Sequence, residues 1–378
     1  MTPIENKKLV WWRDVPIDVE IGLLTYLSKV WKNDIYIISA NDYEAARKQC
    51  LWNTDSFDNV HMITGNLDEK SNKALTEKLL AEDNVNIFSG VRGGHKKYLD
   101  YLNNDKKHKC VIVMESPSLF GTNLKYTVKK IAYPILYGSY YRKYKSVVKG
   151  LFALGEKGVN IYTSYGWRNV FDFMYLPCLH KQEKSAANKP AEIRMLYIGR
   201  FDYSVKGVNV LMDAIDKLDA KNKWSIDLVG GYGAKKDEVI AWCERTPGAN
   251  YIGSWESGLV VEKMTDYDFC IVPSISDGWN LTPLQTLNAG IGCIITDNAG
   301  SQELIRNSGA GIVVKSNNIV ELKSALEYAL ENREQVMKWK EKALSYADKV
   351  STENVGSYFV KALKYCFGES EERPECPW

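Results

Sequence analysis

Short runs of β-branched and aliphatic residues alternate along the chain with longer stretches in which apolar residues recur every three or four positions. In the first half, Ile17–Val30 has the helical spacing. The short runs predict strands at Lys8–Arg13, Asp34–Ser39, Val85–Ser89 and Cys110–Met114. Strands that alternate with helices in this way form a parallel sheet covered by helices on both faces.

A second series of the same kind follows in the other half of the chain. Gly207–Lys217 is predicted to open a helix, and Ile319–Phe367 is helical by its apolar spacing. The strands of this series are predicted at Arg194–Ile198, Ser225–Val229, Asn250–Ile252, Phe269–Val272 and Cys293–Ile295. The chain therefore carries two similar α/β series.

Between the two series lies a polar stretch, Lys181–Glu192, without aromatic residues or large aliphatic ones. We interpret it as a domain linker rather than a long surface loop. The predicted domains are residues 1–184 and 185–354. We expect an α/β fold of two Rossmann-like, doubly wound domains that face each other across a cleft at the carboxyl ends of their strands.

Composition narrows the class of protein. The 378 residues have a net charge of +2, with eight cysteines and four histidines, none at the spacing of a zinc site. We expect reduced thiols and no bound metal. Without a signal-peptide pattern or an apolar run of about 20 residues, a cytoplasmic location is predicted.

The segment Pro273–Gly300 carries the densest candidate chemistry. A predicted buried strand ends there in Asp277-Gly278. Thr282 followed by Pro283 predicts a helix N-cap and first helical residue. Free N–H groups and the positive end of the helix dipole would bind an anion, with Asp277 beside them and Gln285 in the first turn.

Two cations follow the first strand of the second series. Arg200 and Lys206 lie in the loop after Arg194–Ile198, at the end of the strand where ligands bind in such sheets. Together they could neutralise a diphosphate. Taken singly, each could equally be a solvated loop cation.

Residues 194–304 resemble the donor-binding half of glycosyltransferase family 4, whose enzymes have the GT-B fold. Several elements agree in order and spacing. They are Gly199-Arg200 with Lys206-Gly207, the turn Gly230–Gly233, the strand Asp268–Ser274, the acid–Gly–aromatic element Asp277–Leu281, Asn288–Gly290, and Gly300–Leu304.

The resemblance implies a retaining, metal-independent enzyme that uses a nucleotide-diphosphate-sugar donor. Arg200 and Lys206 would hold the diphosphate, and Gly199 belongs to the same element. The turn from Gly278 through Trp279, Asn280 and Leu281 would contribute backbone N–H groups. The fold also implies that residues 355–378 cross back onto the first domain.

Two acids of the family pattern are altered in this chain. Asp277 stands where the family has a glutamate that touches the donor sugar, and Gln285 stands where a second glutamate grips the ribose. Asn280 replaces a glycine. Glu115, after Cys110–Met114, occupies by position the place of a donor-contacting residue, and a simple loop acid is an equal interpretation.

Two short patterns are similar to motifs of other kinds of site, but neither fits its context in this sequence. Asp266-Tyr267-Asp268 is similar to the metal motif of another glycosyltransferase fold, but Asp268 opens a predicted buried strand. Gly231-Tyr232-Gly233 starts like a dinucleotide fingerprint, yet Lys236 stands at the third glycine position. We therefore predict neither a metal site nor a dinucleotide cofactor.

Residues 116–155 are basic, with seven Lys or Arg, no Asp or Glu, and six interleaved tyrosines. Leu124, Val128, Ile131 and Ile135 follow helical spacing within them. An anionic membrane surface is the leading partner for residues 122–149, ahead of a plain solvated face and of nucleic acid, which we do not expect to bind.

The predicted function is transfer of a hexosyl-type sugar from a nucleotide-sugar to a glycan or polyprenyl-linked acceptor, in bacterial surface polysaccharide synthesis. The enzyme would be cytoplasmic or peripheral on the inner membrane face. Two alternatives stay open: a catalytically impaired sugar-nucleotide-binding protein, and another GT-B enzyme such as an epimerase or phosphorylase.

Overall fold

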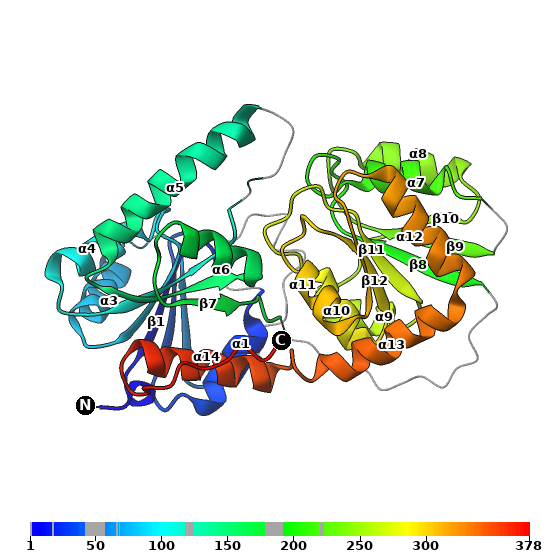
Figure 1. Ribbon diagram of the computed structural model, residues 1–378. Coiled ribbons are helices and arrows are strands. Elements are labelled where there is room, and N and C mark those ends of the chain that lie inside the picture. The colour runs from blue at the N-terminus through cyan, green and yellow to red at the C-terminus, as the bar shows by residue number, and fades with distance from the viewer. Residues whose placement is uncertain are drawn as a thin grey trace. The chain divides into compact units, whose positions relative to one another are not determined.

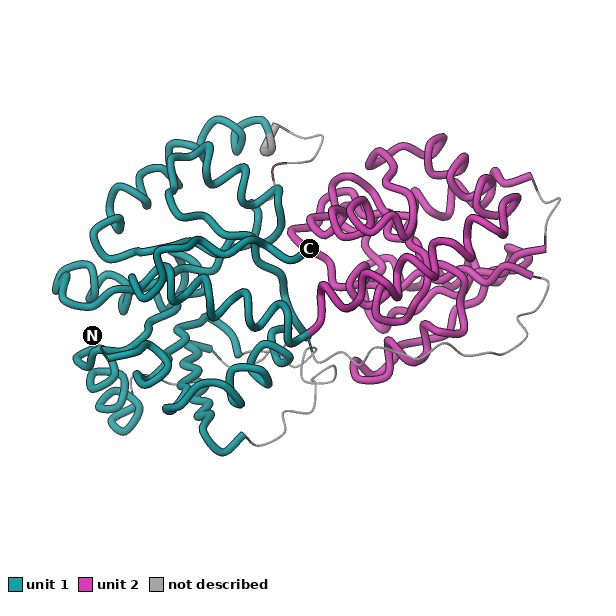
Figure 2. The backbone as a smooth tube through the Cα atoms, turned by 60° about the horizontal axis from the view of Figure 1, so that its bottom comes forward, with its two compact units in different colours: residues 1–117, 127–178, 352–377 teal, residues 118–126, 179–351, 378 magenta. Residues whose placement is uncertain are grey.

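The chain folds into two compact units (Figure 2). The structure is a computed structural model, and it describes residues 2–16, 19–41, 57–65, 67, 69–117, 119, 124–177, 192–219 and 223–378, without the side chains of 124–126. Unit 1 comprises residues 1–117, 127–178 and 352–377, and unit 2 comprises 118–126, 179–351 and 378. The predicted linker and the boundary at 184/185 lie outside the described residues, apart from Glu192.

Unit 1 is built on a parallel sheet of seven strands in the order β3-β2-β1-β4-β5-β6-β7 (Figure 1). The strands are β1 (Leu9–Arg13), β2 (Ile35–Ser39), β3 (Val60–Thr64), β4 (Val85–Ser89), β5 (Cys110–Met114), β6 (Val148–Leu154) and β7 (Val170–Phe173). The helical segments are η1 (Ile4–Asn6), α1 (Ile21–Val30), α3 (Lys70–Ala81), α4 (Lys96–Asp105), α5 (Leu124–Tyr144), α6 (Gly155–Ser164) and α14 (Thr352–Cys366).

The interior strand β1 shows why this sheet needs helices on both faces. Its five residues are all buried. Because side chains alternate along a strand, Trp11 and Trp12 point to opposite faces. Trp12 stacks on Phe88 at 5.9 Å between ring centroids, and Trp11 stacks at 6.2 Å on Phe359 of α14. The C-terminal helix therefore completes the core of unit 1.

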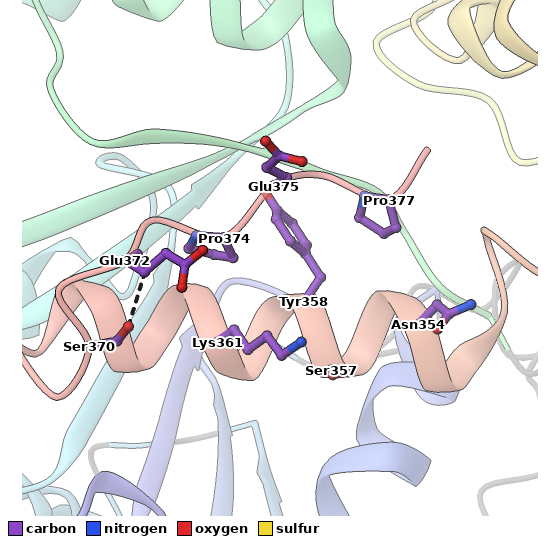
Figure 3. Close-up of a pocket in the computed structure, with 9 residues that line it drawn as sticks. All are labelled: Asn354, Ser357, Tyr358, Lys361, Ser370, Glu372, Pro374, Glu375 and Pro377. Carbon is purple, nitrogen blue, oxygen red and sulfur yellow. Dashed lines mark hydrogen bonds between the residues drawn. The ribbon is translucent and has the colours of Figure 1, made fainter.

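The residues after α14 return along that helix. The guanidinium of Arg373 donates to the carbonyl of Val170 and lies 4.3 Å from the ring centroid of Phe171. Between the helix and this returning segment lies a groove of about 550 Å³ (Figure 3). Tyr358, Lys361 and Glu375 are among its lining side chains.

Unit 2 is built on a parallel sheet of six strands in the order β10-β9-β8-β11-β12-β13. The strands are β8 (Ile193–Ile198), β9 (Trp224–Val229), β10 (Ala249–Gly253), β11 (Phe269–Val272), β12 (Gly292–Thr296) and β13 (Gly311–Val314). The helical segments are α7 (Val208–Ile215), α8 (Lys236–Arg245), η2 (Ser257–Leu259), α9 (Val260–Met264), α10 (Thr282–Ala289), α11 (Gln302–Ser308), α12 (Ile319–Glu331) and α13 (Arg333–Ala347).

The α/β prediction of two doubly wound, Rossmann-like domains is confirmed, with two corrections to helix limits. The predicted helix Ile17–Val30 begins at Ile21. The stretch Ile319–Phe367, predicted to be helical, forms three helices, because Asn332 leaves the helical conformation and the chain turns again between α13 and α14. Such short breaks leave the apolar period nearly unchanged. The predicted cleft between the domains stays a prediction.

A charged cluster fastens α5 to α4 in unit 1. The Asp100 carboxylate accepts hydrogen bonds from Lys143 at 2.6 Å and from Tyr144 at 2.7 Å, and it also pairs with Lys96. Burial opposes its charge, but these three hydrogen bonds prevail and lower the pKa of Asp100 to about 2. Asp100 is therefore an anion in the folded protein at all but very acid pH.

We expect this cluster to contribute stability that acid removes. Because the folded pKa lies below the ordinary value of 3.8, the contribution is present above pH 3.8 and is lost as pH falls toward 2. Asp100→Asn should lower the free energy of unfolding at pH 7 by about 1 kcal/mol and reduce its decline between pH 5 and 2.5. Urea unfolding across that range tests this, with the exposed Asp105→Asn as control. Parallel pH curves for wild type and Asp100→Asn would contradict it.

Candidate functional site

The loop after β8 is shaped by Asp202. One oxygen of its carboxylate, Oδ1, accepts hydrogen bonds from the backbone N–H groups of Ser204 and Val205 and from the Ser204 hydroxyl, at 2.8 to 3.1 Å. Burial raises the pKa of Asp202, but these bonds and the charge of Arg200 lower it further than burial raises it. A carboxylate that binds backbone groups just ahead of it makes an Asx turn, and this turn sets the path from Arg200 to Lys206.

A glycine lets this loop lie against the end of β11. Gly207 has φ of +64°, and a Cβ atom there would lie 2.2 Å from the carbonyl oxygen of Pro273. The Val205 carbonyl accepts the backbone N–H of Ile275 at 2.8 Å. Any side chain at position 207 would therefore move Lys206 away from the residues that follow β11.

Arg200 projects from this loop and is partly anchored. Its Nη2 lies 3.2 Å from Asp202 Oδ2, and its carbonyl accepts the Tyr197 hydroxyl at 2.9 Å. Its Nε is buried and has no acceptor among the described residues. The side chain is 39% exposed, so the other N–H groups of the guanidinium remain accessible to a ligand oxygen.

Lys206 and Asp277 meet between the ends of two neighbouring strands. The Lys206 ammonium lies 2.6 Å from Asp277 Oδ2, which also accepts a hydrogen bond from the Asn280 amide at 3.0 Å. Lys206 follows β8 and Asp277 follows β11. The chain leaves β8 toward β9 and leaves β11 toward β12, on opposite sides, so this is the topological switch point where ligands bind in such sheets.

The turn into α10 differs by one residue from its prediction. The helix begins at Thr282 and its N-cap is Leu281, so Thr282 is not the N-cap. The capping bond comes from Asn280, whose side-chain oxygen accepts the Thr282 backbone N–H at 2.9 Å. Asn280 has φ of +91°, a conformation that asparagine tolerates better than most residues. This explains how asparagine can stand at a position where the resembling family has glycine.

The loop after β12 contacts the backbone of Gly278 and Trp279 and fixes its position. Gly300 donates its backbone N–H to Asp277, and Ser301 donates both its N–H and its hydroxyl to the Trp279 carbonyl. A Cβ atom at position 300 would lie 2.1 Å from the Gly278 carbonyl oxygen. The Trp279 side chain is buried, so what this turn offers a ligand is backbone.

The remaining predicted residues are placed as follows. Gln285 lies in the first turn of α10 with 7% of its surface exposed, and its side chain makes no hydrogen bond to a described residue. Gly199 donates its N–H to Val229 at the end of β8. Glu115 lies in unit 1, at the end of β5, where it accepts the Tyr175 hydroxyl at 2.5 Å. Burial and then the Glu115 charge raise the pKa of Tyr175, which keeps that hydroxyl a donor.

The two patterns set aside in the sequence have structural roles. Asp268 is buried; its two carboxylate oxygens face the backbone N–H of Arg194 at 3.0 Å and the Lys340 ammonium at 3.3 Å. Gly233 lies against the backbone of Phe201. Within the described part of the chain, no cluster of His, Cys, Asp or Glu is arranged to hold a metal ion.

Residues 180–345 match the sequence profile of the family Glycosyl transferases group 1. This segment, a little under half of the chain, is similar to that family. It contains Arg200, Lys206, Asp277 and the turn into α10, so the switch-point site lies within the matched residues. Among curated proteins, none has significant sequence similarity to the chain.

Solved glycosyltransferase structures share the fold of the whole chain. HepE from Anabaena in complex with UDP aligns with a TM-score of 0.71 at 12% identity, covering 94% of this chain and 99% of HepE. A glycosyltransferase from Rickettsia africae aligns with 0.69 at 16% identity, covering 97% and 100%. WaaG, a glycosyltransferase involved in lipopolysaccharide biosynthesis, aligns with 0.59 at 14% identity, covering 94% and 99%. At these identities the likeness establishes the GT-B fold that the sequence predicted.

Asp202, Gly300 and Ser301 shape the switch-point site without having been predicted as site residues. Asp202 had a signal in the sequence, because Asp followed two residues later by Ser is typical of an Asx turn. The contact of Gly300 with Gly278 had no signal in the sequence, because it joins loops that follow two different strands.

Proposed function

We propose that the protein is a retaining, metal-independent glycosyltransferase that transfers a sugar from a nucleotide-diphosphate-sugar to a glycan or polyprenyl-linked acceptor. The observation that carries the proposal is the placement of Lys206, Asp277 and the turn into α10 at the switch point of unit 2, with Arg200 in the same loop as Lys206. Since HepE is described in complex with UDP and with UDP-glucose, UDP-glucose is the first donor to test.

The chemistry follows from charge that develops on the departing diphosphate. Arg200 and Lys206 would oppose that charge, and the backbone N–H groups of Trp279, Asn280 and Leu281 would add hydrogen bonds at the positive end of α10. Asp277 would then contact the donor sugar. The Lys206 ammonium would interact both with the Asp277 carboxylate and with the diphosphate. Gln285 would bind the ribose through its amide.

We expect transfer activity to persist in EDTA, because side-chain cations supply the positive charge that a metal supplies elsewhere. The measurement is release of UDP from UDP-glucose with and without EDTA, after a thermal-shift screen establishes binding. A ligand at 100 times its dissociation constant adds about 2.7 kcal/mol of stability. Complete loss of activity in EDTA, restored by manganese, would contradict this prediction.

A second candidate is a sugar-nucleotide-binding protein with impaired catalysis. It is favoured by one observation, the neutral Gln285 at a position that is acidic in the resembling family. Thermal stabilisation by UDP-glucose without transfer to any acceptor or to water would support it. Restoring the acid with Gln285→Glu would then be expected to raise turnover.

Helix α5 supports the proposed location at an anionic membrane surface. Val128, Ile131 and Ile135 are 55%, 69% and 67% exposed and lie on one helix face. Tyr137 and Tyr144 face the other way and are buried in the unit 1 core, and Tyr133, Tyr140 and Tyr141 pack against it. None of the described helices is long and apolar enough to cross a bilayer. The proposed contact is therefore an aliphatic stripe with basic residues around it.

Replacing Ile131 and Ile135 with Ser should weaken binding to phosphatidylglycerol vesicles by on the order of 10-fold or more, because both side chains would lose their apolar burial. Vesicle sedimentation at low salt measures this, and binding should fall as added salt shortens the Debye length. Val320→Ser in unit 2, 73% exposed, is the matched control. Lys143 is left unchanged because it pairs with Asp100. Wild-type protein that stays in the supernatant would refute membrane docking.

A further inference from the structure

Unit 1 has a switch point of its own. In its sheet, β1 lies between β2 and β4, the chain leaves β1 toward β2, and it leaves β4 toward β5 on the other side. The carboxyl ends of β1 and β4 therefore border a crevice of the kind in which α/β sheets bind ligands. In unit 2 the equivalent position holds the pair of Lys206 and Asp277.

A second pair of polar side chains, a carboxylate and an imidazole, lies at this place. Asp14 directly follows β1, and His95 follows β4 at the start of α4. Asp14 Oδ1 lies 3.1 Å from His95 Nδ1 and accepts the backbone N–H of Gly94 at 2.6 Å. The other ring nitrogen of His95 faces the Gly90 carbonyl oxygen at 3.2 Å.

The two side chains differ in exposure in a way that separates their roles. His95 is 1% exposed, whereas the Asp14 side chain is 41% exposed. Oδ2 of Asp14 has no hydrogen-bond partner among the described residues. The histidine is thus a fixed support, and the carboxylate offers one free oxygen to solvent.

The backbone beneath the carboxylate is shaped to admit it. Gly93 has φ of +97°, and a Cβ atom there would lie 1.8 Å from Asp14 Oδ2. A Cβ atom at Gly94 would lie 2.7 Å from that of Ala40. Asp14 can therefore take this position only because residue 93 is glycine, and residue 94 is small because it lies against Ala40.

We propose that Asp14 binds a hydroxyl group of the acceptor sugar, and that His95 is a positioning residue that holds the Asp14 carboxylate. The inference rests on the proposed glycosyltransferase function. A carboxylate accepts hydrogen bonds and donates none, so it selects hydroxyl-bearing neutral sugars and repels phosphate. The group recognised is therefore a sugar ring and not the phosphate of a lipid carrier.

The test measures sugar and donor binding separately. Methyl glucoside, methyl galactoside and methyl N-acetylglucosaminide serve as probes in saturation-transfer NMR, and UDP-glucose binding is followed by thermal shift. Asp14→Asn should weaken glycoside binding by about 10- to 100-fold, as expected for a lost hydrogen bond to a charged group, and leave UDP-glucose binding unchanged. Asp105→Asn, an exposed acid in the same unit, should change neither.

His95 is tested by rescue. His95→Asn keeps an N–H donor for Asp14 and should bind glycosides within a few-fold of wild type, whereas His95→Phe should match Asp14→Asn. A loss of UDP-glucose binding as large as that of glycoside binding would indicate general damage and overturn the positioning role. Unchanged glycoside binding in Asp14→Asn, or no glycoside binding by wild type, overturns the proposal. Glycoside binding without any nucleotide-sugar binding would instead refute the proposed function and leave the Asp14 site standing.

Discussion

Arg200→Ala is expected to lower turnover of UDP-glucose by on the order of 10²–10³-fold, the effect of removing one group that stabilises a developing negative charge. The Arg200 side chain is 39% exposed and pairs with Asp202, so the exposed N–H groups of the guanidinium are accessible to the departing diphosphate. Initial rates of UDP release measure the effect.

Lys217→Ala is the control, because Lys217 is an exposed cation just after α7 in the same unit. It should retain wild-type rates. Arg200→Lys should recover part of the loss, because lysine restores the positive charge but lacks the planar set of N–H donors of a guanidinium. Near-normal turnover of Arg200→Ala would remove Arg200 from the site.

Gly300→Ala is expected to destabilise unit 2 and to abolish most donor binding together. The new Cβ atom would meet the Gly278 carbonyl oxygen at 2.1 Å and the Trp279 Cα at 3.1 Å, so the turn that presents backbone N–H groups must shift. Overpacking of this kind costs about 1–3 kcal/mol. Thermal unfolding with and without UDP-glucose separates the loss of stability from the loss of affinity.

Gly258→Ala is the matched control for this substitution. A Cβ atom at position 258 would have no heavy atom within 4 Å, so the same chemical change should leave both stability and donor affinity near wild type. If Gly300→Ala binds UDP-glucose as tightly as Gly258→Ala does, the turn at 278–281 does not hold the donor.

Much of the architecture could be read from the chain because it depends on local patterns. Parallel strands buried on both faces require continuous apolar runs, and the Cys110–Met114 and Phe269–Val272 strands were predicted at their observed limits. The cations after β8 and the acid after β11 could also be placed, because strand ends lie at one edge of a parallel sheet. Helix limits were less certain, since one residue such as Asn332 ends a helix while the apolar period continues.

The pairings within each site could not be predicted, since they join residues far apart in the chain. Three such contacts depend on how strand ends and loops approach each other in three dimensions. They are the Lys206–Asp277 ion pair, the contact of Gly300 with Gly278, and the packing of Asp14 against Gly93. The α5 segment shows the same limit. Its basic and tyrosine-rich composition was evident in the sequence, but burial of Tyr137 and Tyr144 in the unit 1 core is what left the aliphatic face of that helix exposed. A local pattern determines which element a segment forms, whereas packing between elements determines which of its faces remains available for binding.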